Sequence, residues 1–470
     1  MDRTCISSPP FFFFFQRAIH KTFHSTLSIN LLYISFITMP DIQLLTRDVN
    51  GPNTAPIKPR VERQWNIKAA PAVARSRNPI RETLASITAN PPSTSATLIN
   101  LGLGDPTHYP LAAPPPAATT AVRDALESER SNGYVLGAGT IEARQAVADY
   151  HKKWDNVDYT VDSIVLTHGV GHAIDMIFSI LCPHGDSKAN VLLPRPGFSQ
   201  YSSLLASFGT DIRYYDCIEE KNWEVDVEMI DSLCDENTKA LVIINPSNPC
   251  GSNYSRESLQ KIVAVAEKNK VVVIADEIYG HMTWDGAFTP LAALSDSVPI
   301  LTLSGLSKRF LLPGWRFGWI CLHDPLSVAG DIKRGMATSG NRFMGPSSLT
   351  QKALPEILAT PGSWFDEVTA KIETNAKIMY NAIQATPGIS TNFPSGALYM
   401  LVRIDPKILP QLADDVAFAT ALYREEAVFA LPGICFEAPG YVRLVLGAPA
   451  DIMSEVAERL RAFCERHARV

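Results

Sequence analysis

A lysine just after a short apolar run is the first residue in this sequence that could carry out covalent chemistry. Residues 298–303 have the length and composition of a buried strand, and Lys308 follows them after Ser304, Gly305 and Ser307. A lysine that loses water has a depressed pKa, and its free amine can form a Schiff base with an aldehyde. Because a lone loop lysine is more often exposed to solvent, this interpretation depends on the residues that share its site.

Three other apolar runs also end in groups that could do chemistry. They lead into a glycine turn, an amide, and a carboxylate followed by a phenol: Gly169, Val170 and Gly171 after residues 164–166, Asn248 after residues 241–244, and Asp276 with Tyr279 after residues 271–275. In an open parallel sheet, ligands bind beyond the carboxyl ends of the strands. If the four runs lie side by side, a glycine turn that could bind an anion, an amide, a carboxylate and an amine converge on one crevice.

Each of these groups also has an ordinary structural explanation. A glycine turn that opens a helix exposes N–H groups to an anion, but this one lacks the third glycine of a dinucleotide fingerprint and the lysine of a P-loop. Asp276 taken alone fits a helix N-cap. Arg443, inside the apolar run 441–447, faces either solvent or a pocket in which its planar fork could bind a carboxylate.

The elements that would position these groups form two patterns. From residue 97 onward, apolar runs alternate with helical stretches, which indicates an α/β fold with a mostly parallel sheet flanked by helices. After about residue 345, long helical stretches and short strands indicate a smaller α+β domain. We therefore expect four segments: an N-terminal extension and arm over 1–75, disordered in part, the start of the small domain over 76–100, a large domain over 101–345, and a small C-terminal domain over 346–470.

The bulk composition is that of an ordinary globular enzyme with two domains, at 470 residues, 46% hydrophobic and 19% charged. The net charge of −6 is spread along the chain without a basic run, so we expect no nucleic-acid partner. The apolar patch 27–37 is too short to span a bilayer, so we expect no membrane association. The eight cysteines show no CxxC pair, which predicts reduced thiols in a reducing compartment, the cytoplasm, and no metal site.

The first 38 residues allow three interpretations. They could be a transit segment for mitochondria, since no acidic residue lies between Arg3 and Met39. They could also be a disordered extension, or the result of a mistaken gene start with Met39 as the true first residue. We favour the last interpretation because a small-residue cleavage site is not visible.

Four motifs together resemble a known enzyme family. They are Asn-Pro-Ser-Asn-Pro-Cys-Gly at 245–251, Ala-Asp-Glu-Ile-Tyr-Gly at 275–280, Ser-Lys-Arg-Phe at 307–310 with Pro-Gly-Trp-Arg-Phe-Gly-Trp at 313–319, and the late Arg443. In this order they resemble the class I aminotransferases of the pyridoxal-phosphate fold-type I, most closely the tyrosine aminotransferase branch. The resemblance runs from about residue 76 to the C-terminus, and it implies a pyridoxal 5'-phosphate cofactor.

The resemblance also implies roles for residues around the cofactor ring. Lys308 is similar to the lysine that binds pyridoxal phosphate and then moves a proton at the substrate Cα. Asp276 resembles the carboxylate that keeps the ring nitrogen protonated, so that the ring can take up electrons. Asn248 and Tyr279 resemble the pair that bonds the ring 3-oxygen, and Phe198 lies where the family stacks an aromatic side chain on the ring.

Further positions match the phosphate and substrate contacts of the family. The phosphate positions are Gly169, Val170, Gly171 and Arg316, and Ser304 and Ser307 lie where one of them could replace a hydroxyl that the family often has at position 305. Tyr134 is similar to a tyrosine that reaches the phosphate of the neighbouring subunit, which implies a homodimer with shared sites. Arg443 resembles the clamp for the substrate α-carboxylate, with Asn248 beside it, and Gly104 lies where a backbone group lines the substrate.

Two reactions on this scaffold remain open from the motifs. The first is transamination, in which an aromatic L-amino acid, tyrosine or phenylalanine, passes its amino group to a 2-oxo acid such as 2-oxoglutarate. The alternative is a lyase that eliminates a β or γ substituent, for example by C–S cleavage, because both reactions use the same cofactor residues. A lyase releases ammonia from one substrate, whereas a transaminase needs an acceptor. A cofactor-holding sensor is disfavoured because residues 1–75 lack a basic helix-turn-helix pattern.

Overall fold

The computed structural model describes residues 65–109, 111–186, 188–412 and 414–469. The chain divides into two units, residues 1–66 and 67–470, and the architecture below is that of the second unit. The expectations for residues 1–64 therefore lie outside the described residues. Within the described part of the chain, no helix combines the length and the apolar character needed to cross a membrane.

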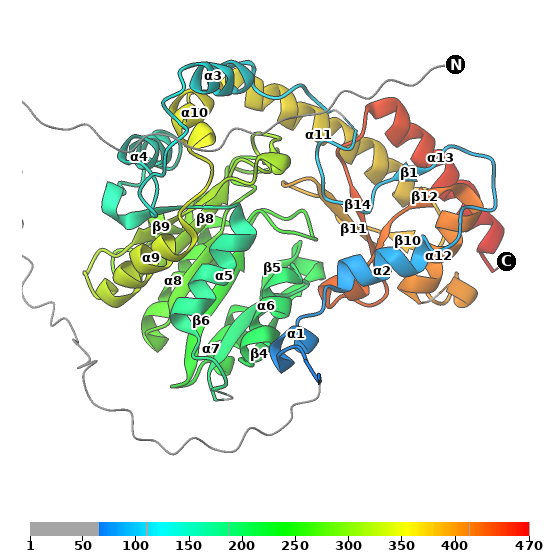
Figure 1. Cartoon of the computed structure of the whole chain (residues 1–470). Coiled ribbons are helices and arrows are strands. Elements are labelled where there is room, and N and C mark those ends of the chain that lie inside the picture. The colour runs from blue at the N-terminus through cyan, green and yellow to red at the C-terminus, as the bar shows by residue number, and fades with distance from the viewer. Residues whose placement is uncertain (1–64, 110, 187, 413, 470) are drawn as a thin grey trace, which may run out of the picture. The chain divides into compact units, whose positions relative to one another are not determined.

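An eight-stranded sheet forms the centre of the larger domain (Figure 1). Its strands, in spatial order, are β2 (Ile164–Thr167), β9 (Gly318–His323), β8 (Ile300–Gly305), β7 (Val272–Asp276), β6 (Thr238–Ile244), β3 (Asn190–Arg195), β4 (Asp211–Ile218) and β5 (Glu224–Val225). The five strands from β8 to β4 pair in parallel, whereas β9 and β5 run antiparallel to their neighbours. The expected α/β fold with a mostly parallel sheet is confirmed.

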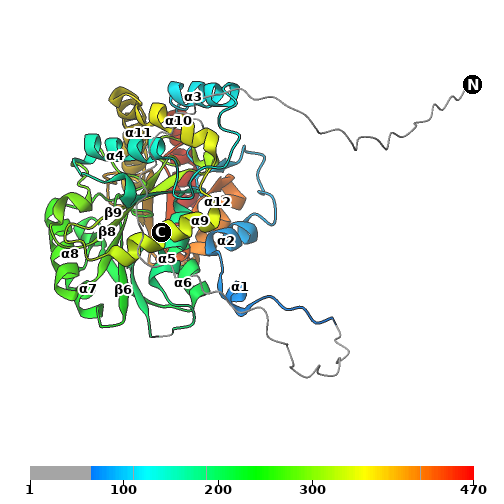
Figure 2. The same ribbon diagram turned by 60° about the vertical axis from the view of Figure 1, so that its left-hand side comes forward.

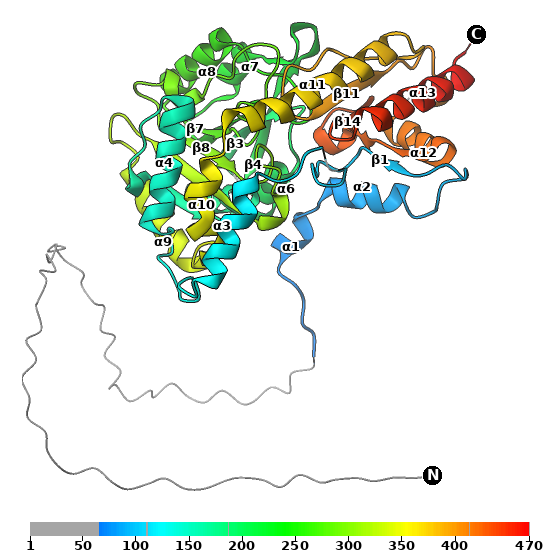
Figure 3. The ribbon, with the colours of Figure 1, turned by 90° about the horizontal axis from the view of Figure 1, so that it is seen from above.

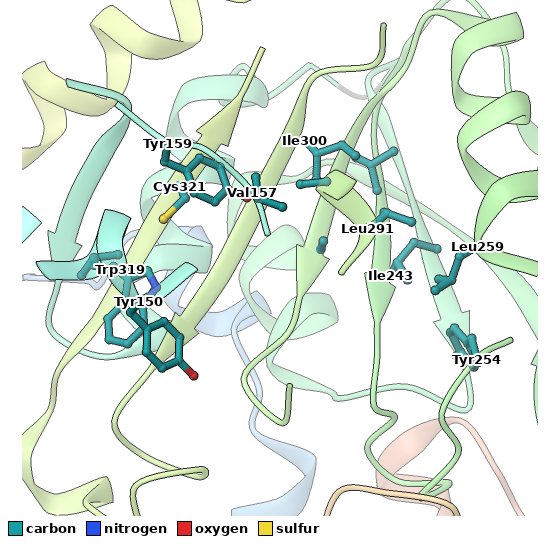
Figure 4. Packing of buried hydrophobic residues seen from close by; sticks show 14 of the residues in the cluster. Tyr150, Val157, Tyr159, Ile243, Tyr254, Leu259, Leu291, Ile300, Trp319 and Cys321 are labelled. Atoms are coloured by element: carbon teal, nitrogen blue, oxygen red, sulfur yellow. The ribbon is translucent and has the colours of Figure 1, made fainter. Parts of the chain in front are cut away.

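Helices cover both faces of this sheet (Figures 1 and 2). One face packs on α3 (Pro116–Glu127), α4 (Ile141–Asp155), α7 (Val227–Leu233), α8 (Arg256–Asn269) and α10 (Ser348–Leu358), and the other on α5 (Val170–Leu181), α6 (Gln200–Phe208) and α9 (Gly330–Phe343). Alternate residues of a strand face opposite sides, so Leu241 and Ile243 join the first core, part of which Figure 4 shows, while Val242 and Ile244 join the second. Burial on both faces explains why these strands read as continuous apolar runs.

The smaller domain is built around a second sheet and a separate core. The antiparallel order is β10 (Ile389–Ser390), β11 (Tyr399–Ile404), β14 (Tyr441–Val445) and β13 (Leu431–Pro432), and β1 (Ile99–Asn100) pairs in parallel with β12 (Val428–Phe429). Its helices are α2 (Pro79–Ile87), α12 (Asp415–Glu426) and α13 (Ala450–His467). Because β1 pairs with β12, the segment near residue 100 belongs to this α+β layer, and the short helix α1 (Pro71–Arg75) precedes it.

One long helix, α11 (Gly362–Gln384), contributes to both cores. Phe365 packs in the large-domain core, whereas Ile372, Ala376 and Met379 pack in the small-domain core. Figure 3 shows α11 running from beside α10 to a position alongside α13. The helix therefore connects the two domains by packing in the core of each. The expected domain bounds at 100, 345 and 346 stay a prediction.

Candidate active site

The carboxyl ends of β6, β7 and β8 open onto one cavity of about 420 Å³. Its lining includes most of the residues singled out in the sequence, namely Gly104, Val170, Gly171, Phe198, Asn248, Asp276, Tyr279, Ser307, Lys308, Arg316 and Arg443. Asp276 ends β7, and Lys308 follows the neighbouring parallel strand β8, so sheet topology brings the carboxylate and the amine to the same edge. Chain segments more than three hundred residues apart thus meet in one hollow, because Arg443 enters it from the smaller domain.

Asp276 is a buried carboxylate, only 3% exposed, at the floor of the cavity. One carboxylate oxygen accepts a hydrogen bond from the Tyr201 hydroxyl at 2.8 Å, and the other accepts one from the Ile278 amide at 3.3 Å. Burial raises the pKa of Asp276 to about 6, although these hydrogen bonds and the charge of Lys308 oppose the rise. A turn rather than a helix follows β7, so the carboxylate does not serve as a helix N-cap.

Lys308 and Tyr279 face each other across the cavity. The Lys308 ammonium donates a hydrogen bond to the Gly104 carbonyl and lies 5.9 Å from the centre of the Tyr279 ring. The Tyr279 hydroxyl shares a 2.6 Å hydrogen bond with the Tyr399 hydroxyl, and the two rings meet edge to face. Burial raises the pKa of Tyr279 well above its ordinary value, so the hydroxyl keeps its proton and can donate it in a hydrogen bond.

Arg443 projects from β14 and is 2% exposed. Its terminal nitrogens donate to the Asn248 side-chain oxygen at 2.8 Å and to the Gly102 carbonyl at 2.7 Å. The guanidinium carbon lies 4.3 Å from the centre of the Tyr399 ring, and Nε has no hydrogen-bond partner among the described residues. An arginine with an unpaired donor and no ion pair to a carboxylate among the described residues is equipped to bind a carboxylate ligand.

The other end of the cavity is electropositive. Gly169, with a φ of +80°, precedes the first turn of α5, where backbone N–H groups point outward without helical partners. Arg316 donates to the Pro313 and His168 carbonyls, and its guanidinium lies so close to Gly169 that a side-chain carbon there would meet it at 2.6 Å. Together with the Ser307 hydroxyl, these donors can hold an anion.

Three predicted residues lie elsewhere. Gly169 lies just behind the lining, against Arg316, and Ser304 is buried within β8. Tyr134 is 92% exposed and does not line the cavity. The structure therefore brings together the strand-end residues and the late arginine, but it gives Tyr134 no contact with the site of its own chain.

Several site residues were missed by reasoning from the sequence. Tyr399 sits in a stretch that reads only as a strand, and Tyr201 reads only as part of a helix. Gln200, which starts α6, and Ile80 and Arg81 of α2 also line the cavity. A tyrosine pair across two domains leaves no spacing signal, so only the folded chain reveals it.

The fold and this site define an aminotransferase. A family profile described as "Aminotransferase class I and II" matches residues 96–460, and the chain belongs to that family. The enzymes of this family use pyridoxal 5'-phosphate, and the protein is a pyridoxal-phosphate-dependent aminotransferase.

Individual relatives and one solved structure are similar to the chain over most of its length. The chain is 38% identical to tyrosine aminotransferase of Homo sapiens over 91% of its own length and 94% of that protein. It is 36% identical to the S-alkyl-thiohydroximate lyase of Arabidopsis thaliana over 79% of its length and 81% of that protein. The crystal structure of tyrosine aminotransferase from Leishmania infantum superposes with a TM-score of 0.82 at 31% identity, covering 87% of this chain and all of that one.

The residues present fit the cofactor. The buried Asp276 carboxylate, whose pKa is raised to about 6 by burial, forms no ion pair with the described residues, and a protonated pyridine nitrogen would supply one. The electropositive end at α5 and Arg316 suits a phosphate dianion, and the amine of Lys308 suits an aldehyde. Each polar part of pyridoxal phosphate therefore has a chemically matched group in this cavity.

Proposed function

We propose that the enzyme transfers the amino group of an aromatic L-amino acid, tyrosine or phenylalanine, to a 2-oxo acid such as 2-oxoglutarate. The observation that carries this proposal is Arg443, a buried guanidinium with an unpaired Nε in the same cavity as Lys308. An α-carboxylate held there places the substrate Cα toward the lysine. The names of the animal and protozoan relatives support the aromatic side chain, and the apolar lining by Ile80, Leu103 and Ile278 suits a ring.

The residue roles follow from the chemistry of each side chain. Lys308 binds the cofactor and its Nζ carries the proton from the substrate Cα. Asp276 pairs with the ring nitrogen, Asn248 and Tyr279 bond the ring oxygen, and Phe198 covers the ring face. When bound, pyridoxal phosphate supplies a ring that takes up electron density from the substrate.

A second group of residues holds the phosphate. It comprises Gly169, Val170, Gly171, Ser307 and Arg316, with Ser304 beside them in β8. Gly104 and Asn248 complete the substrate side, the first through its carbonyl and the second through its bond to Arg443. Arg316 acts here as a fixed fork, since its two carbonyl contacts hold its orientation before the anion arrives.

A panel of amino donors with 2-oxoglutarate tests the reaction. We expect formation of glutamate and an aromatic 2-oxo acid, with kcat/KM for tyrosine or phenylalanine about tenfold or more above that for alanine. The panel should include aspartate as an acidic control. Equal rates with alanine and tyrosine would remove the aromatic assignment while leaving the transaminase class intact.

The lyase alternative has one supporting observation, the likeness to the plant S-alkyl-thiohydroximate lyase. Product stoichiometry separates the two reactions. We expect turnover of tyrosine to stop when the 2-oxo acid is withheld and ammonia to stay at background. Ammonia release from an S-substituted cysteine without an acceptor, at a rate comparable to transamination, would favour the lyase.

We also propose that the enzyme forms a homodimer in which Tyr134 completes the phosphate site of the neighbouring subunit. Its exposure of 92%, together with the exposed Leu136 and Phe343, supports a surface that a second copy covers. A subunit-mixing experiment tests this. In a hybrid of Lys308→Ala and Tyr134→Ala subunits, one site carries both defects and the other carries none, so activity above that of either parent is expected. No recovery would mean that Tyr134 does not act across subunits.

The compartment is proposed to be the cytoplasm. The seven cysteines of the described chain are all free, which suits a reducing environment. Localisation of a full-length fusion, compared with one that begins at Met39, would test this against the mitochondrial alternative.

A further inference from the structure

The residue after the lysine points away from the cavity. The loop after β8 is closed by backbone bonds from Leu312 to Leu306 and from Leu311 to Lys308, each 3.0 Å long. Lys308 lines the cavity, whereas Arg309 enters the large-domain core and is 4% exposed. A buried arginine next to the reacting amine requires an explanation, because a guanidinium rarely leaves water without a function or a partner.

Aromatic rings surround the Arg309 guanidinium, and it forms no ion pair with a carboxylate among the described residues. Its guanidinium carbon lies 4.1 Å from the Trp154 ring centre and 4.2 Å from that of Phe365. It donates a hydrogen bond to the Tyr150 hydroxyl, and its Nε has no partner among the described residues. Planar stacking on rings is specific to arginine, since a lysine ammonium cannot reproduce it.

The rings of Tyr150, Trp154 and Phe365 form an aromatic cage around Arg309. Residues next to this cage also contact the turn that carries Tyr279. Asp155, at the end of α4, lies 2.5 Å from His151 Nδ1 and 2.6 Å from Nε2 of His281, which is two residues after Tyr279. The Trp154 ring lies 5.6 Å from the His281 ring. The last turn of α4 therefore contacts His281, two residues after Tyr279, and Arg309, the residue after Lys308.

The cage also reaches the substrate side of the site through α11. Phe365, one wall of the cage, lies near the start of α11. Ten residues along the same helix, the buried Asn375 side chain donates to the carbonyls of Leu446 and Ala448 at 2.7 and 2.6 Å. These carbonyls directly follow β14, the strand that carries Arg443. Helix α11 thus contacts Arg309 of the lysine loop near one end and, ten residues along, the backbone just after the strand that carries Arg443.

We propose that Arg309 is a positioning residue that, through Phe365 and α11, fixes the distance between Lys308 and Arg443. The inference rests on the proposed roles of those two residues. Arg443 holds one end of the substrate and Lys308 acts at its Cα, so a loosened α11 leaves binding intact and misaligns proton transfer. Misplacement of a reacting group by about 1 Å can lower a rate by about 100-fold.

Arg309→Lys tests the proposal because it keeps the charge and removes the planar stacking. At equal cofactor occupancy we expect kcat for tyrosine to fall about tenfold or more while KM changes less than about threefold. The visible circular dichroism of the bound cofactor, which reports how asymmetrically it is held, should change as well. Arg144→Lys is the matched control, since Arg144 is a buried arginine on α4 and does not line the cavity. It donates to the backbone carbonyls of Gly139 and Val161 and pairs with Asp162 at 3.6 Å.

A double-mutant cycle on kcat tests whether Arg309 acts through Phe365. If Arg309 acts through Phe365, Arg309→Lys combined with Phe365→Leu should lower kcat no further than the worse single variant. Should Arg309→Lys fail to fold, Phe365→Leu alone decides by the same split between kcat and KM. A kcat within about twofold of the parent, with unchanged dichroism, would overturn the proposal. Lys308→Ala is assayed alongside to separate failure of this inference from failure of the proposed function. Turnover in Lys308→Ala would contradict the proposed function itself.

Discussion

Replacing Asp276 by asparagine should stabilise the cofactor-free protein and weaken the loaded one. Burial raises the pKa of Asp276 from 3.8 to about 6, although the charge of Lys308 opposes the rise. Between these values the folded protein holds a proton that the unfolded chain has released. Stability therefore falls as pH rises from about 4 to about 6, and the deficit is fully present above pH 6. Asparagine has no proton to lose, so the variant escapes this pH dependence.

The size of the effect follows from the same numbers. One pKa unit corresponds to about 1.4 kcal/mol, so the rise from 3.8 to about 6 amounts to ~3 kcal/mol at neutral pH. Asparagine offers one oxygen and one NH2 group, so it cannot accept from both the Tyr201 hydroxyl and the Ile278 amide. That mismatch costs about 1 kcal/mol. We expect a net gain of about 2 kcal/mol for the cofactor-free variant at pH 8. At pH 4 we expect a net loss of less than about 1 kcal/mol, because the mismatch remains while the cost of burying the charge has almost vanished.

Urea unfolding of both cofactor-free proteins at pH 4 and pH 8 measures the difference. The difference in unfolding free energy between parent and variant is free of contributions from groups that titrate alike in both proteins. The loaded proteins should show the reverse order, because the ring nitrogen pairs with a carboxylate and not with an amide. A cofactor-free variant that is less stable than its parent at pH 8, or a difference that does not depend on pH, would refute the reasoning about burial of the charge.

Three further outcomes test the site. Lys308→Ala should retain the cofactor loosely and lose its visible absorbance band and its turnover, as seen by spectrophotometry and product assay; full activity would remove the mechanism. Arg443→Lys should lower kcat/KM for tyrosine by about 100-fold, because a point charge cannot replace the fork that also bonds Asn248 and Gly102; an unchanged value would place the carboxylate elsewhere. Asp276→Ala should reduce kcat far more than Phe198→Leu, since only the former removes the ring's electron demand; equal effects would contradict the role of the strand-end carboxylate.

Much of the site could be predicted because it follows from backbone topology. Parallel strands end at the same edge, so the order of apolar runs sufficed to bring Asp276 and Lys308 together. Tyr399 could not be predicted in this way, since its neighbour Tyr279 lies 120 residues away in the other domain. The same holds for Tyr201, whose bond to Asp276 depends on how α6 lies against the sheet. Side-chain contacts between elements depend on packing, and packing leaves no periodic pattern in the chain.

Two glycines in the Leu-Gly-Leu-Gly segment at 101–104 let one stretch of backbone contact both Arg443 and Lys308. A side-chain carbon at Gly102 would lie 2.2 Å from the Phe429 ring, and one at Gly104 would lie 2.4 Å from the Tyr399 hydroxyl. Only glycine therefore lets this backbone come close enough for its carbonyls to accept from Arg443 and Lys308. One short segment thus bonds two of the cations that line the cavity, the Arg443 guanidinium and the Lys308 ammonium. If Lys308 binds an aldehyde as proposed, its amine has to leave the Gly104 carbonyl, so ligand binding would break this hydrogen bond.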